Sequence, residues 1–483
     1  MNYTIIGAGP TGLTAGYLLL QKNQKVTILE RDSQVGGISK TVRYKKYRFD
    51  IGGHRFFAKI PEITEFWHEM LGRQFLSVKR SSRIFYNRKF YNYPLEPKNA
   101  LFNLGPFQAT LAIASYVKSK FGKRPEDSLA DVYINSFGSV LYKKFFENYS
   151  TKLWGMSPAK MEPDWGTQRV GKLSLTVAIK DAFFPKSDDE VKTLTKRFKY
   201  PKYGPGMMWE TVARKIKRKG GKVLLDSPVE KIIHKDKRVI EIYCSSSTQA
   251  GTRTSHFASL PKGKPPARRI KVDNLLSTMA LRDLILSLSP EPPEKVLKAA
   301  RGIKYRDFIL VAVVVKCKET FPDQWIYIQD PGYRATRIQN VKNWSRFMVP
   351  DNKKSVLNME YVTNEDEDLW QMTDSELAAL AKKEIVGLGF AKEKELGEAM
   401  VVRQLKAYPV YDLGYKAKLE IIKNYLSQFE NLVTIGRNGM HKYNNMDHSM
   451  LTAIQAVENI FGSKHDIWQV NVNADYHETV KKK

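Results

Sequence analysis

The chain has 483 residues, which is enough to bury a large core, and we expect two or three domains. With 42% hydrophobic and 11% aromatic residues, its composition excludes a wholly disordered protein. The formal net charge is +29. No nucleic-acid-binding motif presents that charge, so we expect no nucleic-acid partner. Solvated lysine-rich faces account for most of it, and peripheral association with an anionic membrane surface is the alternative.

Cysteine usage and the start of the chain bear on the compartment. Cys244 and Cys317 are the only cysteines, and they lie far apart in apolar, strand-like contexts. This pattern argues against a disulfide scaffold and a cysteine-based metal site. Met1 leads directly into an apolar run, which leaves no room for a signal peptide. We therefore expect a cytoplasmic protein with no bound metal.

The first motif in chain order is a glycine-rich turn between a strand expected over residues 2–6 and a helix expected over 13–20. The turn reads Gly7-Ala8-Gly9-Pro10-Thr11-Gly12. In a βαβ unit, Gly7 permits the tight turn, Gly9 lets the backbone approach a pyrophosphate, and Gly12 allows close helix–strand packing. The N-terminus of the helix then offers unpaired N–H groups and a positive dipole to the phosphates.

A second strand is expected over residues 25–29, directly before Glu30 and Arg31. At this position the Glu30 carboxylate would accept hydrogen bonds from an adenosine ribose. Strand, helix, strand and acid follow in the required order, and together they predict a dinucleotide site. An NAD-binding domain followed by an ordinary glycine-rich loop is the alternative to FAD.

The segment after Glu30 favours FAD. Glu30 is followed at a spacing of five residues by Gly36-Gly37, with Ser39 close behind, and then by Gly52-Gly53-His54. This pattern resembles the second fingerprint of the FAD-containing amine oxidase and protoporphyrinogen oxidase superfamily. The resemblance implies that these glycines let the chain pass against the phosphates and ribityl chain of FAD.

The remaining periodicity predicts a mixed α/β (α+β) fold in which the FAD-binding domain is discontinuous and Rossmann-like. We assign residues 1–75, 200–300 and 430–483 to it. Residues 96–199 form a mostly helical insertion. A substrate domain built on an antiparallel sheet takes 76–95 and 301–429.

Three segments carry more specific expectations. The continuous apolar run from Phe308 to Val315 is typical of a strand buried on both faces. The apolar stretch from Ala100 to Val117 is expected to be a core or domain-packing helix, and a monotopic membrane anchor is the alternative. Residues 245–272 hold six basic and no acidic residues, and we expect a solvated loop that is dispensable for catalysis.

Several segments resemble UDP-galactopyranose mutases, particularly the eukaryotic-type enzymes. The loop Gly52-Gly53-His54-Arg55-Phe56-Phe57 is similar to their histidine loop. The closing run from Gly436 to Ile460 is similar to their C-terminal flavin segment. Shorter pieces occur in the same order as their active-site segments: Gln168-Arg169-Val170, Trp325-Ile326-Tyr327, Tyr333-Arg334-Ala335-Thr336, Met359-Glu360 and Tyr408-Pro409.

This resemblance implies a nucleotide-sugar mutase that interconverts pyranose and furanose rings in cell-surface polysaccharide biosynthesis. Reduced FAD would supply N5 as the nucleophile at the anomeric carbon, and NAD(P)H or another reductant would keep it reduced. Arg169 and Arg334 would clamp the diphosphate, because guanidinium forks match phosphate geometry. His54 would tune N5 through its loop backbone.

The resemblance also implies further contacts. Tyr327, Tyr408 and Tyr443 would donate hydroxyls to the phosphates, and Asn445 would support the sugar or the phosphates. Arg437 would touch the flavin or an active-site acid such as Glu360. The C-terminal cofactor-binding residues would be Gly436, Arg437, Asp447, Ser449 and Met450.

The nucleotide side departs from the mutase pattern. This chain has Tyr93-Pro94-Leu95-Glu96 where the family has Tyr-Pro-Phe-Gln, and Ser150 where the family has asparagine. The linker before Asp447-His448-Ser449 is also about two residues shorter. These departures leave the sugar and the nucleotide open. The alternative function is an FAD-dependent oxidoreductase of the amine oxidase or protoporphyrinogen oxidase type, which would have an apolar cavity and no paired arginines.

Overall fold

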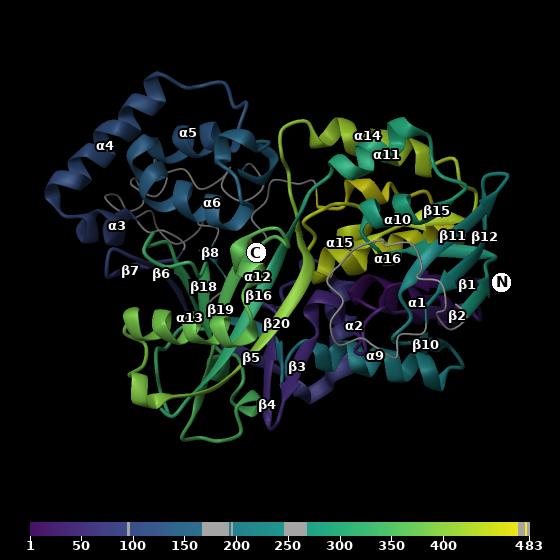
Figure 1. The fold of residues 1–483 in the computed structure, drawn as a ribbon, viewed down its shortest axis with the longest axis horizontal. Helices are drawn as coiled ribbons and strands as arrows, with labels where there is room; N and C mark the ends of the chain where they lie inside the picture. Colours follow the sequence, from purple (N-terminus) through teal and green to yellow (C-terminus); the bar gives the residue numbers. More distant parts are fainter. Residues whose placement is uncertain (94–96, 167–192, 195–196, 246–267, 472–478, 481–483) are drawn as a thin grey trace.

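The computed structural model describes residues 1–93, 97–166, 193–194, 197–245, 268–471 and 479–480. The chain has a mixed α/β fold, as predicted, in which a parallel sheet and a larger mixed sheet are accompanied by a separate group of helices (Figure 1). The N-terminus lies at the parallel sheet.

The parallel sheet has the strand order β10-β2-β1-β14-β21. Its strands are β1 (Asn2–Ile6), β2 (Lys25–Leu29), β10 (Lys222–Leu224), β14 (Asn274–Ser277) and β21 (Leu432–Thr434). Every pairing is parallel. The start, the middle and the end of the chain therefore meet in one sheet.

Both faces of the parallel sheet are buried, because alternate side chains of a strand enter different cores. Ile5 packs in one core and Ile6 in the other. The first core is covered by α1 (Pro10–Gln21), α2 (Pro61–Leu71), α9 (Gly206–Arg218) and α16 (Met446–Ile460). The second contains α10 (Leu281–Ser287), α11 (Glu294–Gly302), α14 (Tyr415–Leu426) and the sheet of β11 (Val229–Lys235), β12 (Arg238–Cys244), β13 (Arg268–Lys271) and β15 (Leu288–Ser289).

The larger sheet has the order β20-β16-β19-β18-β17-β6-β7. These strands are β6 (Ser82–Tyr86), β7 (Lys89–Asn92), β16 (Tyr305–Val315), β17 (Trp325–Ile328), β18 (Arg337–Asn340), β19 (Ser355–Thr363) and β20 (Leu396–Pro409). The prediction for 308–315 is confirmed, since Ile309 and Leu310 enter opposite cores and all of β16 is buried. Helix α13 (Asp374–Gly387) covers one face.

The helical group comprises α3 (Pro97–Leu104), α4 (Pro106–Phe121), α5 (Leu129–Leu141) and α6 (Asn148–Trp154). The expectation of a core or domain-packing helix over 100–117 holds only for the side of α4 that packs against α5, and the rest of this helix is mostly exposed. Only Ala112, Tyr116 and Ser119 of this helix are buried, because α5 covers one narrow side of it. None of the described helices is long and apolar enough to cross a membrane.

Smaller elements connect these layers. A hairpin joins β3 (Thr41–Tyr44) with β4 (Tyr47–Asp50), and a second antiparallel pair joins β5 (Phe75–Lys79) with the distant β9 (Arg197–Pro201). Residues 436–439 form a short helix, α15 (Gly436–Gly439), which begins at the positive φ of Gly436, +86°. Most of the basic segment 245–272 lies outside the described residues.

Candidate functional site

The glycine-rich turn after β1 is held tightly by its neighbours. Gly7 has φ +97°, and a side chain there would lie 2.1 Å from Thr278 Oγ1. A side chain at Gly12 would lie 2.0 Å from the Gly7 carbonyl oxygen. The Gly7 N–H donates to Leu29 O at 2.7 Å. The backbone therefore runs close to both β2 and α1, as the spacing of the glycines predicts.

Gly9 and Gly37 face each other across a gap that no side chain of either residue fills. A Cβ at Gly9 would lie 3.8 Å from Gly37 Cα, which is ordinary contact and no clash with the protein. Helix α1 begins here with Pro10 and Thr11 and has no side-chain cap at its N-terminus. Two glycine backbones and an uncapped helix N-terminus make a cradle that fits a pyrophosphate.

Glu30 links the two glycine loops. Its Oε2 accepts the Ala8 N–H at 2.6 Å and its Oε1 accepts the Asp32 N–H at 3.0 Å. Burial raises the pKa of this carboxyl, and the two backbone donors oppose that effect. Gly36 donates its N–H to Ala8 O at 2.8 Å, while Arg31 is exposed. The acid is thus placed beside the cradle, where a ribose would follow the phosphates.

The C-terminal segment closes over the N-terminal turn. A side chain at Gly436 would lie 2.5 Å from Thr11 Oγ1, and the Gly436 N–H donates to Thr452 Oγ1 at 3.1 Å. Asp447, in the first turn of α16, is buried, and burial raises its pKa to about 7. Gly436 therefore lies against the start of α1, next to the proposed pyrophosphate cradle.

The side chains of Ser39 and Met450, two of the expected cofactor-binding residues, bind other parts of the protein. Ser39 Oγ donates to Gly36 O at 2.9 Å. The Met450 sulfur accepts the Trp67 indole N–H at 3.1 Å inside the core. Ser449 is buried, and its carbonyl accepts the Thr452 hydroxyl at 2.7 Å.

The His54 loop lies against the larger sheet. Gly52 has φ +85°, and a side chain at Gly53 would meet Trp325 and Trp344 at 3.2 Å. His54 Nδ1 lies 3.1 Å from Gly52 O. Burial and, to a smaller extent, the nearby Arg337 and Arg437 lower the His54 pKa to about 4. The imidazole is therefore neutral at physiological pH and is not poised for proton transfer there.

Tyrosines gather next to this loop. Tyr408 and Tyr443 stack with ring centroids 5.7 Å apart, and Tyr327 lies 5.8 Å from Tyr149. Burial raises the pKa of Tyr149 well above its usual value, and the charges of the neighbouring tyrosines add to this effect. Its hydroxyl is therefore a neutral donor at physiological pH. The structure brings together the three predicted tyrosines and adds Tyr149, which the sequence analysis missed.

Arg337 and Glu360 form a buried ion pair at the centre of this group. Arg337 Nε donates to Glu360 Oε2 at 2.7 Å, and the two side chains are only 15% and 2% exposed. Gln339 donates to the other carboxylate oxygen. Burial alone would lower the pKa of Arg337, but Glu360 and the neighbouring Tyr408, Tyr327 and Tyr149 together hold that pKa well above its usual value.

Sheet register explains why Arg337 belongs to the site. Arg337 on β18 pairs with Tyr327 on β17 and with Glu360 on β19, so the three residues form a row across the sheet. Its guanidinium carbon lies 5.3 Å from the Trp325 ring centroid. Neighbouring residues on adjacent strands share a face. The arginine could have been found from the sequence only if these strand pairings were known.

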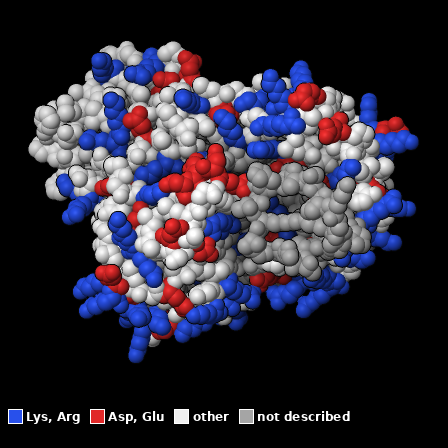
Figure 2. Space-filling view, in the orientation of Figure 1, with Lys and Arg blue, Asp and Glu red and all other residues white. Residues whose placement is uncertain are grey.

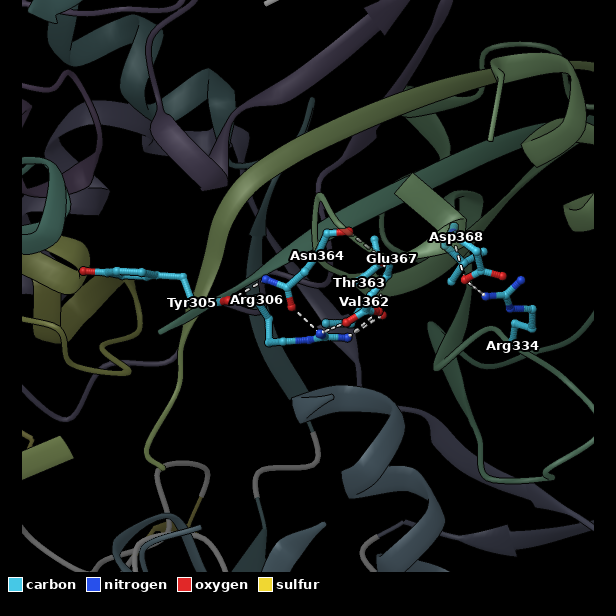
Figure 3. Close-up of polar contacts among 9 residues, drawn as sticks. Tyr305, Arg306, Arg334, Val362, Thr363, Asn364, Glu367 and Asp368 are labelled. Atoms are coloured by element: carbon cyan, nitrogen blue, oxygen red, sulfur yellow. Dashed lines mark hydrogen bonds and ion pairs between the residues drawn. The ribbon is translucent and has the colours of Figure 1, made fainter. Parts of the chain in front are cut away.

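Arg334 lies outside this group. Its Nη2 donates to Asp368 Oδ1 at 2.5 Å, and the two side chains are 38% and 69% exposed. Figure 3 shows this pair apart from the buried Arg306, which binds Asn364 and Glu367. The described contacts therefore do not join Arg334 to the tyrosines. Its predicted clamp partner, Arg169, lies outside the described residues.

Arg437 contacts the tyrosines and not the acid. Its guanidinium carbon lies 4.0 Å from the Tyr443 ring centroid, and its Nε and Nη2 donate to Ala407 O at 3.1 and 2.8 Å. The expected contact with Glu360 is not among the described contacts, because Arg337 and Gln339 take up that carboxylate. Asn445 caps α16, and its side chain is half-buried. Within the described residues no group of three or more metal-ligating side chains occurs.

Comparison with known proteins agrees with this arrangement. Residues 10–420 match the family of flavin-containing amine oxidoreductases, which implies a flavin cofactor. An L-amino-acid oxidase of Crotalus adamanteus is 24% identical over 348 residues, which cover 68% of this chain and 59% of the oxidase. The chain thus matches less than two thirds of the length of such relatives.

Solved structures show the same fold. The reduced form of a UDP-galactopyranose mutase superposes with a TM-score of 0.82 at 19% identity, covering 99% of this chain and 97% of the mutase. A putative protoporphyrinogen oxidase from Exiguobacterium sp. 255-15 superposes with a TM-score of 0.70 at 16% identity, covering 95% and 98%. At these identities the likeness concerns the fold.

Proposed function

The chain belongs to the family of flavin-containing amine oxidoreductases, and from that premise we propose that it is an FAD-dependent mutase acting on a nucleotide sugar. When bound, reduced FAD would supply the nucleophilic N5 for exchange between pyranose and furanose rings. The cradle between Gly9 and Gly37 would hold its pyrophosphate, and Glu30 its adenosine ribose.

The charge and polarity of the residues gathered beside the His54 loop support this proposal. Arg337 and Arg437 bring two permanent positive charges beside His54, against the one carboxylate of Glu360. The phenols of Tyr149, Tyr327, Tyr408 and Tyr443 add hydroxyls and aromatic faces. A net positive, hydroxyl-rich group suits a polyhydroxylated anion such as a nucleotide sugar better than an apolar amine or porphyrin.

The side chains would act by holding the substrate. Neutral phenols donate hydrogen bonds to phosphate or sugar oxygens, and the Arg337 fork, fixed by Glu360, keeps its donors in one orientation. The neutral His54 would support the loop backbone beside the flavin. We propose for Arg337 the role that the sequence analysis gave to Arg334, because Arg337 contacts Tyr327, whereas Arg334 pairs with the exposed Asp368.

The overall similarity to a UDP-galactopyranose mutase structure over nearly the whole chain supports the same proposal. NAD(P)H or another electron donor would then reduce the flavin. The product would serve cell-surface polysaccharide biosynthesis in the cytoplasm.

Oxidation of an amino acid is the second candidate, because the curated relatives are L-amino-acid oxidases. An arginine fork also binds a carboxylate, so Arg337 could hold an α-carboxylate. In that case an amino acid would reduce the flavin, and a nucleoside diphosphate would have no site beside it.

Binding of UDP and other nucleoside diphosphates to the reduced, FAD-loaded protein separates the two candidates. Arg337→Lys should weaken binding by about 1–3 kcal/mol for each charge-assisted hydrogen bond lost. Arg334→Lys is the matched control and should leave binding unchanged. Failure of the wild-type protein to bind any nucleoside diphosphate would refute the mutase proposal, and equal loss in both variants would refute the choice of Arg337.

A further inference from the structure

Helices α3 and α4 expose an unusual concentration of large apolar side chains. Six of the eleven exposed large hydrophobic residues in the described part of the chain lie between residues 102 and 121. They are Phe102, Phe107, Leu111, Ile113, Val117 and Phe121. The three phenylalanines are 86%, 72% and 90% exposed. Apolar side chains concentrated in this way mark an interaction surface, whereas scattered ones do not.

Helix periodicity places most of these residues on one side of α4. Phe107, Leu111 and Phe121 are separated by four and ten residues, so they recur on one stripe of the helix. The buried Ala112, Tyr116 and Ser119 face the opposite way, toward α5 and the core of the helical group. The exposed stripe is therefore the side of α4 left without a partner by the described fold.

Basic residues outnumber acidic ones around the stripe, and the acidic Glu126 and Asp131 beside it lie 3.6 and 3.8 Å from Lys123 and Arg124. Residues 97–125 contain no aspartate or glutamate, while Lys118, Lys120, Lys123 and Arg124 lie in or just after the last turns of α4. In Figure 2 the edge of the molecule over α4 is mainly white, with basic and fewer acidic side chains beside it. An apolar helix face bordered by basic residues is typical of helices that lie in the interface of an anionic membrane.

We propose that the α3–α4 surface docks on a lipid bilayer with anionic headgroups. The phenylalanines would enter the boundary between headgroups and acyl chains, and the lysines would contact the lipid phosphates. With 16 residues, α4 is about 24 Å long, so it would lie along the surface of the bilayer and not across it. A second copy of the chain fits less well, because symmetric pairing would bring the same basic residues together.

Vesicle co-sedimentation of the full, FAD-loaded protein tests this surface. We expect binding to phosphatidylcholine vesicles that contain phosphatidylglycerol, weaker binding to phosphatidylcholine alone, and loss of binding as salt rises. The triple variant Phe102→Ser, Phe107→Ser, Phe121→Ser should bind at least about tenfold more weakly, because three apolar side chains no longer enter the bilayer. Lys118→Gln with Lys123→Gln should lower binding to the anionic vesicles alone.

The matched control carries Ile240→Ser, Val386→Ser and Leu413→Ser, three exposed apolar residues outside this surface. It should bind vesicles as the wild type does, and flavin absorbance should be unchanged in every variant. Equal binding by the wild type and the phenylalanine variant would overturn the proposal. Absence of vesicle binding by the wild type would also overturn it. If light scattering then shows a dimer that the phenylalanine variant dissociates, the surface is an interface between two copies of the chain.

Discussion

Arg337 and Glu360 form one buried pair that bears on both the stability of the fold and the proposed substrate site. Taking two charges out of water is costly, and the pair tolerates burial because Nε and Nη2 of Arg337 both contact one carboxylate oxygen while Gln339 contacts the other. The pair also orients the guanidinium toward Tyr327. The same residues therefore carry a stability prediction that does not depend on the substrate.

Glu360→Ala should lower the free energy of unfolding by about 3–5 kcal/mol, because it leaves the Arg337 charge buried without a partner. Urea denaturation monitored by circular dichroism measures this change. Asp368→Ala is the control, since it removes the exposed partner of Arg334 and should cost about 1 kcal/mol or less. A loss of similar size in both variants would contradict the assigned burial of the Arg337 pair.

At the scale of elements, the turn between β1 and α1 contains two kinds of glycine. One is required by the close packing of the fold, and the other leaves room for a ligand. Gly12 packs against the Gly7 carbonyl, whereas Gly9 faces only the backbone of Gly37 at ordinary contact distance. The two positions have the same sequence signature. Because their surroundings differ, a side chain at Gly9 should affect ligand binding, whereas a side chain at Gly12 should affect the stability of the fold.

Gly9→Val should leave the protein folded and lower its flavin content at least about tenfold, because the new side chain would occupy the approach of the pyrophosphate. Gly12→Ala should instead destabilise the fold, because its Cβ would lie 2.0 Å from Gly7 O. Flavin absorbance per protein and thermal unfolding measure the two effects. Full flavin retention by Gly9→Val would show that the cradle lies elsewhere.

His441, just after α15, is buried against Val410, the residue that follows β20, and its protonation tests this packing. Its Nε2 lies 3.2 Å from Val410 O, and burial lowers its pKa to about 4. The unfolded chain takes up a proton below about pH 6.5, whereas the folded state does not until about pH 4. The stability contributed by neutral His441 is therefore lost as the pH falls through this window.

His441→Asn should remove that dependence, and asparagine tolerates the positive φ of this position, +49°. The wild type minus variant difference in unfolding free energy should fall by about 1.4 kcal/mol per pH unit between pH 6.5 and 4. The buried Asp50 and Asp447, whose pKa values are raised to about 7, have the opposite effect on stability as the pH falls. Both are present in the wild type and the variant, so the difference between the two proteins removes their effect. A difference independent of pH would contradict the burial of a neutral His441.

For the whole molecule, the sequence predicted the features that depend on local spacing. The turn from Gly7 to Gly12, the strand ending before Glu30 and the apolar strand over 308–315 each carry their signal within a few residues. Sheet register is different, because Arg337 meets Tyr327 and Glu360 through pairing of strands separated by loops of differing length. No local pattern distinguishes Arg337 from Arg334 as the buried arginine.

The exposed face of α4 was mispredicted for a related reason. An apolar stripe at helical spacing is the same whether a core or another partner covers it. Only the position of α5, on the side of Ala112 and Tyr116, shows which face is left open. Tertiary packing, not helix propensity, therefore decides between a core helix and a docking surface.

We propose that this flavoprotein, once its flavin is reduced, rearranges a nucleotide sugar with no net consumption of reductant. Dithionite-reduced protein should be incubated without oxygen with a panel of nucleotide sugars, and the products separated by chromatography. We expect one sugar to be converted between its pyranose and furanose forms by the reduced protein, to yield no product with the oxidised protein, and to leave the flavin reduced. Absence of any conversion, together with flavin reduction of the oxidised protein by an amine or amino acid, would contradict the claim.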